Sequence, residues 1–181
     1  AEVGCNHKGE IEIAKEFIKV AREFCDVSCI KFQKRDPKTL LSEEEYNSPH
    51  PVEENSYGKT YGEHREFLEF DIKEHKTLKK ECEDKGLEYF SSVWDVESTK
   101  DICSLNPKKI KIGSATNLNF KVLEYICKNY NGEIHLSLGM TTKIEEKKIV
   151  EFFKKHKRNK DLILYACTSA YPVESDDVCL L

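Results

Sequence analysis

Several segments of the sequence carry polar side chains of types that bind anions or move protons. Glu2 stands between alanine and valine in an apolar run, where a buried carboxylate is costly unless it is paired or used in catalysis. Lys31 and Gln33 alternate with Ile30 and Phe32, so they share one face of a strand. The remaining candidates lie at or just past the ends of later apolar runs: Ser92, Lys111, Ser114, Ser137, Ser169 and Tyr171. Lysine supplies a point charge and serine a short donor, which together suit phosphate or carboxylate oxygens.

Two other interpretations of these residues remain open. Each serine, taken alone, is a plausible N-cap of the helix that follows it. A lysine in a buried strand is also the nucleophile of Schiff-base aldolases, although that chemistry needs only one lysine. Two strand lysines together with several hydroxyls favour an anion site.

The elements that must position these residues alternate between two hydrophobic periods. Short apolar runs predict strands at 1–5, 27–33, 87–92, 108–112, 133–138 and 161–167, and amphipathic helical patterns lie between them. Strands separated by helices indicate a parallel sheet. The turn "GCNHKG" is not the glycine-rich phosphate turn of a doubly wound sheet. We therefore predict an incomplete (β/α)8 TIM barrel of about six β/α units, forming one domain over 1–181 that is truncated at both ends.

The segment 36–62 interrupts this alternation with a run rich in proline, serine, asparagine and acidic residues. Long connections of this kind usually serve as lids or partner contacts, and a disordered surface insertion is the alternative. Tyr46, Tyr57 and Tyr61 favour a packed segment.

Composition narrows the class of protein. The chain has 181 residues, of which 34% are charged, and its formal net charge of -4 argues against nucleic-acid binding. Apolar runs are shorter than the roughly 20 residues that span a bilayer, so we expect no membrane contact. Eight cysteines without a CxxC pair predict reduced, buried thiols in a cytoplasmic protein.

Six motifs, in order along the whole chain, resemble the sialic acid synthase family, the phosphoenolpyruvate-dependent synthases of nonulosonic acids. "AEVGCNHKG" resembles the family's AEIGxNHxG opening and "IKFQKR" its KxQ strand. "SSVWD", "KIGSATN", "LSLGMTT" and "CTSAYP" are similar to its later strand ends.

The resemblance implies a reaction and a role for each candidate. Phosphoenolpyruvate would condense with an N-acylated hexosamine, such as N-acetylmannosamine, to give an N-acetylneuraminate- or legionaminate-type acid and phosphate. Glu2 would be the acid/base group, and Ser169 and Tyr171 would line the sugar side. Phosphoenolpyruvate would be held by Lys31, Gln33, Ser92, Lys111, Ser114 and Ser137.

The resemblance also implies parts that lie outside this sequence. The family binds Mn²⁺ or Mg²⁺ through two histidines that we expect beyond Leu181, so we predict no metal ligands within the chain. A C-terminal antifreeze-like domain, which caps the neighbouring site in a homodimer, is likewise expected beyond it. Alone, the chain would then be inactive. A catalytically silent barrel that binds anionic metabolites is the alternative from a different functional class.

Three further polar residues have local interpretations. His135 lies on the same face as Ser137 and is expected to be a hydrogen-bonded histidine inside the barrel. His7 is expected either to orient Glu2 or to touch substrate. Asp95 is expected to be a helix N-cap.

Overall fold

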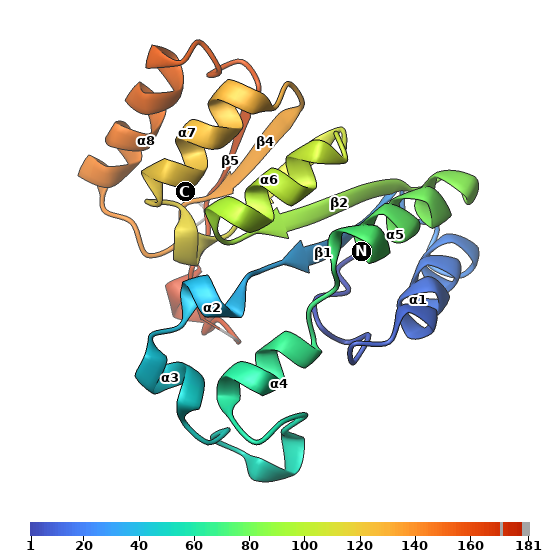
Figure 1. The fold of residues 1–181 in the computed structure, drawn as a ribbon. Helices are drawn as coiled ribbons and strands as arrows, with labels where there is room; N and C mark the ends of the chain where they lie inside the picture. Colours follow the sequence, from blue (N-terminus) through green and yellow to red (C-terminus); the bar gives the residue numbers. More distant parts are fainter. Residues whose placement is uncertain (171, 179–181) are drawn as a thin grey trace.

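A parallel sheet forms the centre of the computed structural model, which describes residues 1–170 and 172–178. Its strands are β1 (Cys29–Lys34), β2 (Glu88–Val93), β3 (Lys109–Ile112), β4 (Glu133–Ser137) and β5 (Leu162–Tyr165). Neighbours in the sheet follow the chain order β1-β2-β3-β4-β5 (Figure 1). Every connection therefore steps in the same direction, as in a (β/α) barrel and unlike a doubly wound sheet, whose order reverses. The predicted incomplete barrel is confirmed.

The first predicted strand is reduced to a single bridge beside β1. Glu2 pairs in parallel with Lys31, and Val3 N donates to Lys31 O at 2.9 Å. Lys31 N in turn donates to Ala1 O at 2.8 Å. Residues 1–3 thus lie at one edge of an open sheet, and β5 lies at the other.

Five helices cover one face of the sheet, and short helical turns occupy the connections (Figure 1). The covering helices are α1 (Ile11–Glu23), α5 (Ile72–Asp84), α6 (Val96–Ser104), α7 (Phe120–Asn129) and α8 (Lys143–Lys155). The short ones are α2 (Pro37–Leu40), α3 (Glu43–Asn47), η1 (Glu53–Asn55), α4 (Tyr61–Phe67), η2 (Ser114–Thr116) and η3 (Ser175–Asp177).

The core lies entirely between these helices and the sheet. Alternate strand residues such as Ile30, Phe32, Ile110 and Ile112 pack there and are almost completely buried. Each contributes about 1.5–3 kcal/mol relative to an exposed position. The intervening residues point to the opposite face, which would be the interior of a barrel. Packing of the core therefore does not explain why residues on that face are polar.

The helical pattern over residues 63–86 is divided in the structure. α4 ends at Phe67, and α5 begins after Asp71, whose carboxylate accepts from Glu74 N at 2.8 Å while Glu74 caps Asp71 N at 2.7 Å. This capping box starts a new helix inside a continuous amphipathic pattern. The amphipathic pattern over 63–86 alone would favour one long helix, whereas the structure has two.

The segment 36–62 carries short helices of its own and lies beyond the carboxyl end of β1 (Figure 1). Tyr57 stacks on Phe67 with ring centroids 4.8 Å apart, and a Cβ at Gly62 would collide with the Tyr46 ring. The tyrosines pack, as expected, so the disordered alternative is not supported.

The cysteines of the described part are free, but they are not uniformly buried. Cys82 and Cys103 are buried, and burial raises the pKa of each thiol to about 12. Cys25 and Cys167 are exposed, so the expectation of buried thiols holds for only some of them. Across the same described residues, every helix is too short or too polar to traverse a lipid bilayer.

Candidate functional site

Lys31 lies at the centre of a first group of polar side chains on the open face of the sheet. Its Nζ donates to Ser92 Oγ at 3.2 Å and forms an ion pair with the Glu2 carboxylate. The Lys31 side chain is 18% exposed and that of Glu2 is 55% exposed. The expectation that Glu2 is buried in a strand was therefore wrong, because its segment lies at the sheet edge. The carboxylate is nevertheless paired.

Lys111 lies at the centre of a second group, two strands away. Its Nζ donates to Ser137 Oγ and lies 4.4 Å from the centre of the Tyr165 ring. Burial, with a smaller contribution from the positive charge of Lys31, lowers the pKa of this lysine to about 8, while Cys167 and Glu2 oppose the shift. Lys111 is thus a desolvated cation whose contacts are neutral: a hydroxyl, an aromatic face and the Ile112 carbonyl at 3.5 Å.

Ser92 joins the two groups. It accepts from Lys31 and is the register partner of Lys111 on the adjoining strand. Both ammonium groups consequently lie on the same face, near enough for one charge to act on the other. The structure brings together Glu2, Lys31, Ser92, Lys111 and Ser137.

Two further predicted residues meet beside Gly139, just beyond β4. A Cβ at Gly139 would collide with Ser169 Oγ and would lie 2.6 Å from Ser114 Oγ. The Asn117 side chain donates to the carbonyls of Ser137 and Gly139, at 2.9 Å and 3.1 Å, and so holds this strand end. Close approach of two hydroxyls explains why glycine stands at this position.

The last two predicted residues have different outcomes. Gln33 faces the same side as Lys31, but its amide donates to Cys5 Sγ at 2.6 Å instead of to the lysine groups. Tyr171 lies outside the described residues.

The histidines and Asp95 mostly follow their expectations. His135 bonds the Tyr165 hydroxyl at 2.7 Å and Glu133 at 3.2 Å, which confirms a hydrogen-bonded interior histidine. Asp95 accepts from Ser98 N at 2.7 Å and caps α6. His7 stacks on Phe70 at 4.0 Å, and burial lowers its pKa to about 4.

His7 therefore does not orient Glu2 in this structure. Its ring Nδ1 accepts from Gly9 N at 3.1 Å, and the side chain is buried under the opening turn. Its surroundings are those of a packed neutral imidazole.

Three contact residues were missed by the sequence analysis. Arg35 continues the alternation of Lys31 and Gln33, so the period of two could have found it. Tyr165 is the register partner of Ser137 and lies under Lys111. Asn117 lies in the segment "KIGSATN", but no role was expected for it. The contacts of Tyr165 and Asn117 depend on strand register and loop geometry, which no local sequence pattern contains.

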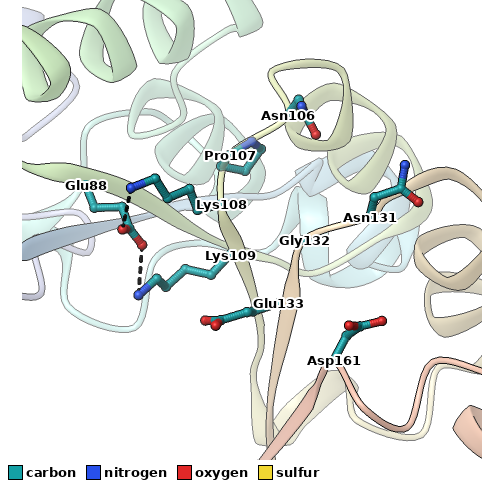
Figure 2. Close-up of a pocket in the computed structure, with 9 residues that line it drawn as sticks. All are labelled: Glu88, Asn106, Pro107, Lys108, Lys109, Asn131, Gly132, Glu133 and Asp161. Carbon is teal, nitrogen blue, oxygen red and sulfur yellow. Dashed lines mark ion pairs between the residues drawn. The ribbon is translucent and has the colours of Figure 1, made fainter.

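A cavity of about 490 Å³ lies at the opposite edge of the sheet, where the strands begin. Figure 2 shows Lys108 and Lys109 paired with the carboxylate of Glu88, and the acidic side chains of Glu133 and Asp161 nearby. The distance from the lysine Nζ to a Glu88 carboxylate oxygen is 3.3 Å for Lys108 and 2.8 Å for Lys109. Within the described part of the chain, the predicted site residues lie elsewhere, at the carboxyl ends of the strands, where barrel enzymes carry their chemistry.

The residues at the strand ends suit an anion better than a metal ion. The described residues contain no group of three or more histidine, cysteine or acidic side chains arranged to hold a metal. The Mn²⁺ or Mg²⁺ site therefore stays a prediction about sequence outside this chain.

Comparison with known proteins relates the chain to one family. The NeuB family model matches residues 17–181. N-acetylneuraminate-9-phosphate synthase of Homo sapiens is 33% identical over 99% of this chain and 49% of its own length. N,N'-diacetyllegionaminic acid synthase of Campylobacter jejuni is 29% identical over 99% of this chain and 54% of its own length.

A solved structure gives the same result. The N-acetylneuraminic acid synthetase from Leptospira borgpetersenii, in complex with citrate, superposes with a TM-score of 0.79 at 26% identity. The match covers 98% of this chain and 56% of that one. The chain spans about half the length of the relatives it matches.

Proposed function

The chain belongs to the NeuB family, and on that premise we propose that the complete protein condenses phosphoenolpyruvate with an N-acylated hexosamine and water. The products are a nonulosonic acid and phosphate. The observation that carries this proposal is the pair of lysines, 31 and 111, on one face at the carboxyl ends of β1 and β3, with Ser92 of β2 between them. Two cations with hydroxyl neighbours match a small ligand that bears both a phosphate and a carboxylate.

The proposed roles follow from the contacts of each side chain. Lys111 and Ser137 form one end of the anion site, and Lys31 and Ser92 form the other. Ser114, beside Gly139, adds a donor at the rim. Gln33 lies on the same face and is held by Cys5, so its role is to shape the wall of the site.

Glu2 is proposed as the acid/base group. In the reaction, C3 of phosphoenolpyruvate forms a bond to the aldehyde carbon of the open-chain sugar, whose oxygen takes a proton, and positive charge develops at C2. Water adds at C2, the C2–O bond to phosphate breaks, and a ketone remains. A carboxylate near C2 stabilises the positive charge and accepts a proton from the water. The ion pair between Glu2 and Lys31 supports this role.

The sugar side of the site is proposed to include Ser169 and Tyr171. Relatives are named for different products, including a 9-phosphate and a diacetyl legionaminic acid. Since three carbons are added at the aldehyde end, C6 of the hexosamine becomes C9 of the product. A 9-phosphate product therefore requires a sugar 6-phosphate, and substrate tests must include both forms.

The metal, the homodimer and the cytoplasmic location are carried as predictions. Mn²⁺ or Mg²⁺ would act as a Lewis acid at the sugar aldehyde, with histidine ligands outside this chain. The chain's own residues bind and orient phosphoenolpyruvate in this scheme.

The test is phosphate release from phosphoenolpyruvate by the complete natural protein. N-acetylmannosamine, its 6-phosphate and diacetylated relatives are supplied with Mn²⁺, and release is expected only with one of these sugars. Glu2→Gln should lower kcat by about 10²–10⁴-fold, the range of general acid/base contributions, while KM for phosphoenolpyruvate stays near the wild-type value. The matched control is Glu12→Gln, on the exposed side of α1, which should behave as wild type. Unchanged turnover in Glu2→Gln contradicts the role of Glu2.

A lysine Schiff-base aldolase is the second candidate, because the lowered pKa of Lys111 is also what an amine nucleophile needs. Borohydride added with the substrates would trap such an intermediate as a covalent adduct on Lys111, which peptide mass spectrometry detects. The proposed synthase forms no adduct.

A further inference from the structure

Arg35 extends the polar row of β1 by one position. Lys31, Gln33 and Arg35 alternate along the chain, and Arg35 follows directly after the strand ends. It is only 5% exposed, which is unusual for an arginine. A buried guanidinium requires partners for its charge and its donors.

Glu69 is the first partner, and it closes the base of the insertion formed by residues 36–68. Arg35 Nε donates to Glu69 Oε1 at 2.5 Å, and Arg35 N donates to Glu69 Oε2 at 3.0 Å. The two side chains are 5% and 8% exposed. Burial raises the pKa of Glu69 and Arg35 opposes that shift, so the carboxylate depends on this arginine. One residue precedes the insertion and the other follows it.

Cys5 is the second partner, and it belongs to the turn that follows Glu2. Arg35 Nη2 donates to Cys5 Sγ at 2.8 Å, and Gln33 Nε2 reaches the same sulfur at 2.6 Å. The turn is tight, because Asn6 bonds Val3 O through both its backbone N at 3.1 Å and its side chain at 2.8 Å. A force on Cys5 is therefore transmitted to the backbone beside Glu2.

Trp94 is the third contact. The Arg35 guanidinium lies 5.7 Å from the centre of its ring, just past the end of β2. Arg35 thus touches the opening turn, the closing residue of the insertion and the end of the neighbouring strand. A planar fork with several donors can make such contacts together, whereas a lysine ammonium is a single point charge.

We propose that Arg35 is a positioning residue that holds the Glu2 turn against the closed base of the insertion. The inference rests on the proposed function for its catalytic consequence, since Arg35 acts on the reaction through Cys5 and Glu2. It predicts that the insertion and the catalytic turn loosen together when Arg35 is changed. Phosphoenolpyruvate binding by Lys31 and Lys111 is affected far less.

Kinetics of the complete protein provide the first test. Arg35→Lys keeps the charge for Glu69 and loses the reach to Cys5, so kcat should fall about tenfold while KM for phosphoenolpyruvate changes less than twofold. Cys5→Ala keeps the ion pair and should give the same loss of kcat with an unchanged melting temperature. The control is Lys38→Met, which breaks the exposed 3.1 Å pair with Glu66 in the same insertion and should leave both constants unchanged.

The opposite results would overturn the proposal. Wild-type kcat in both Arg35→Lys and Cys5→Ala shows that Arg35 does not position the turn. A rise in KM that accounts for the whole loss assigns Arg35 to substrate binding instead. Arg35→Met is the more drastic variant, and the two milder ones decide the outcome if it does not fold.

Hydrogen exchange provides a test that needs no substrate. Arg35→Lys should raise amide exchange several-fold in both 4–9 and 36–68 and leave α7 unchanged. Faster exchange in 36–68 with 4–9 unchanged overturns the coupling. If the wild-type protein releases no phosphate with any sugar, the proposed function fails, and the exchange result still decides the role of Arg35.

Discussion

Lys109 and Lys111 lie two residues apart on the same strand and the same face, yet their surroundings shift their pKa values in opposite directions. A hydrogen bond from Lys109 to Glu88 raises the pKa of Lys109. Burial lowers the pKa of Lys111 to about 8. One lysine lies where the strands begin and the other where they end.

The partners explain the difference. At the beginning of the strands, Glu88 is shared by Lys108 and Lys109, with Glu133 and Asp161 nearby (Figure 2). Burial acts to raise the pKa of Glu88, but the two lysines hold it below its ordinary range. At the strand ends, Lys111 contacts a serine hydroxyl and the face of Tyr165.

The comparison shows that two residues of the same type on one strand acquire opposite pKa shifts from their neighbours. Lys109 is paired with the Glu88 carboxylate and is therefore less available to a ligand than Lys111. Lys31 is also paired, with Glu2, but its bond to Ser92 and its position at the strand ends support its proposed role. A desolvated lysine with neutral partners gains most when an anion binds. The difference between the two lysines therefore favours the carboxyl edge of the sheet as the place of the proposed anion site.

The largest expected effect comes from removing the charge of Lys111. Lys111→Met should cost about 3 kcal/mol of anion binding, the upper range for a charge-assisted hydrogen bond, or roughly a hundredfold in kcat/KM for phosphoenolpyruvate. Steady-state phosphate release measures it. A loss below threefold would contradict the assignment of the two edges.

The next effect is a dependence on pH. Lys111 is protonated below its pKa of about 8 and neutral above it, so the cation that attracts the anion is lost as the pH rises. The value of kcat/KM for phosphoenolpyruvate should fall about tenfold per pH unit above that pKa. Lys111→Arg keeps its charge, since the pKa of arginine exceeds about 12, and should remove this decline. An identical decline in Lys111→Arg would assign it to another group.

The smallest effect is expected at the beginning of the strands. Lys109→Met breaks a partly exposed ion pair, so the free energy of unfolding should fall by less than about 1 kcal/mol. Turnover should stay within twofold of wild type. Urea denaturation and the phosphate assay measure the two quantities. A hundredfold loss of activity here would show that the two edges do not differ in function.

The sequence by itself determined the parallel architecture and the positions of five of the six predicted strands. Its hydrophobic period changes at each element, and residues such as Ile110 and Ile112 must face the helices, which leaves Lys109 and Lys111 on the other face. That placement is local, because successive side chains of a strand alternate. The family motifs are likewise local, because each is a short run of neighbouring residues at one strand end.

Only the tertiary structure decided which polar residues meet. The bond from Lys31 to Ser92 and the stacking of Lys111 on Tyr165 depend on register between strands that are far apart in the chain. The exposure of Glu2, the break at Asp71 and the Arg35–Glu69 pair depend on how edges and connections pack. These contacts join residues across long stretches of sequence, and hydrophobic periodicity describes only neighbours along the chain.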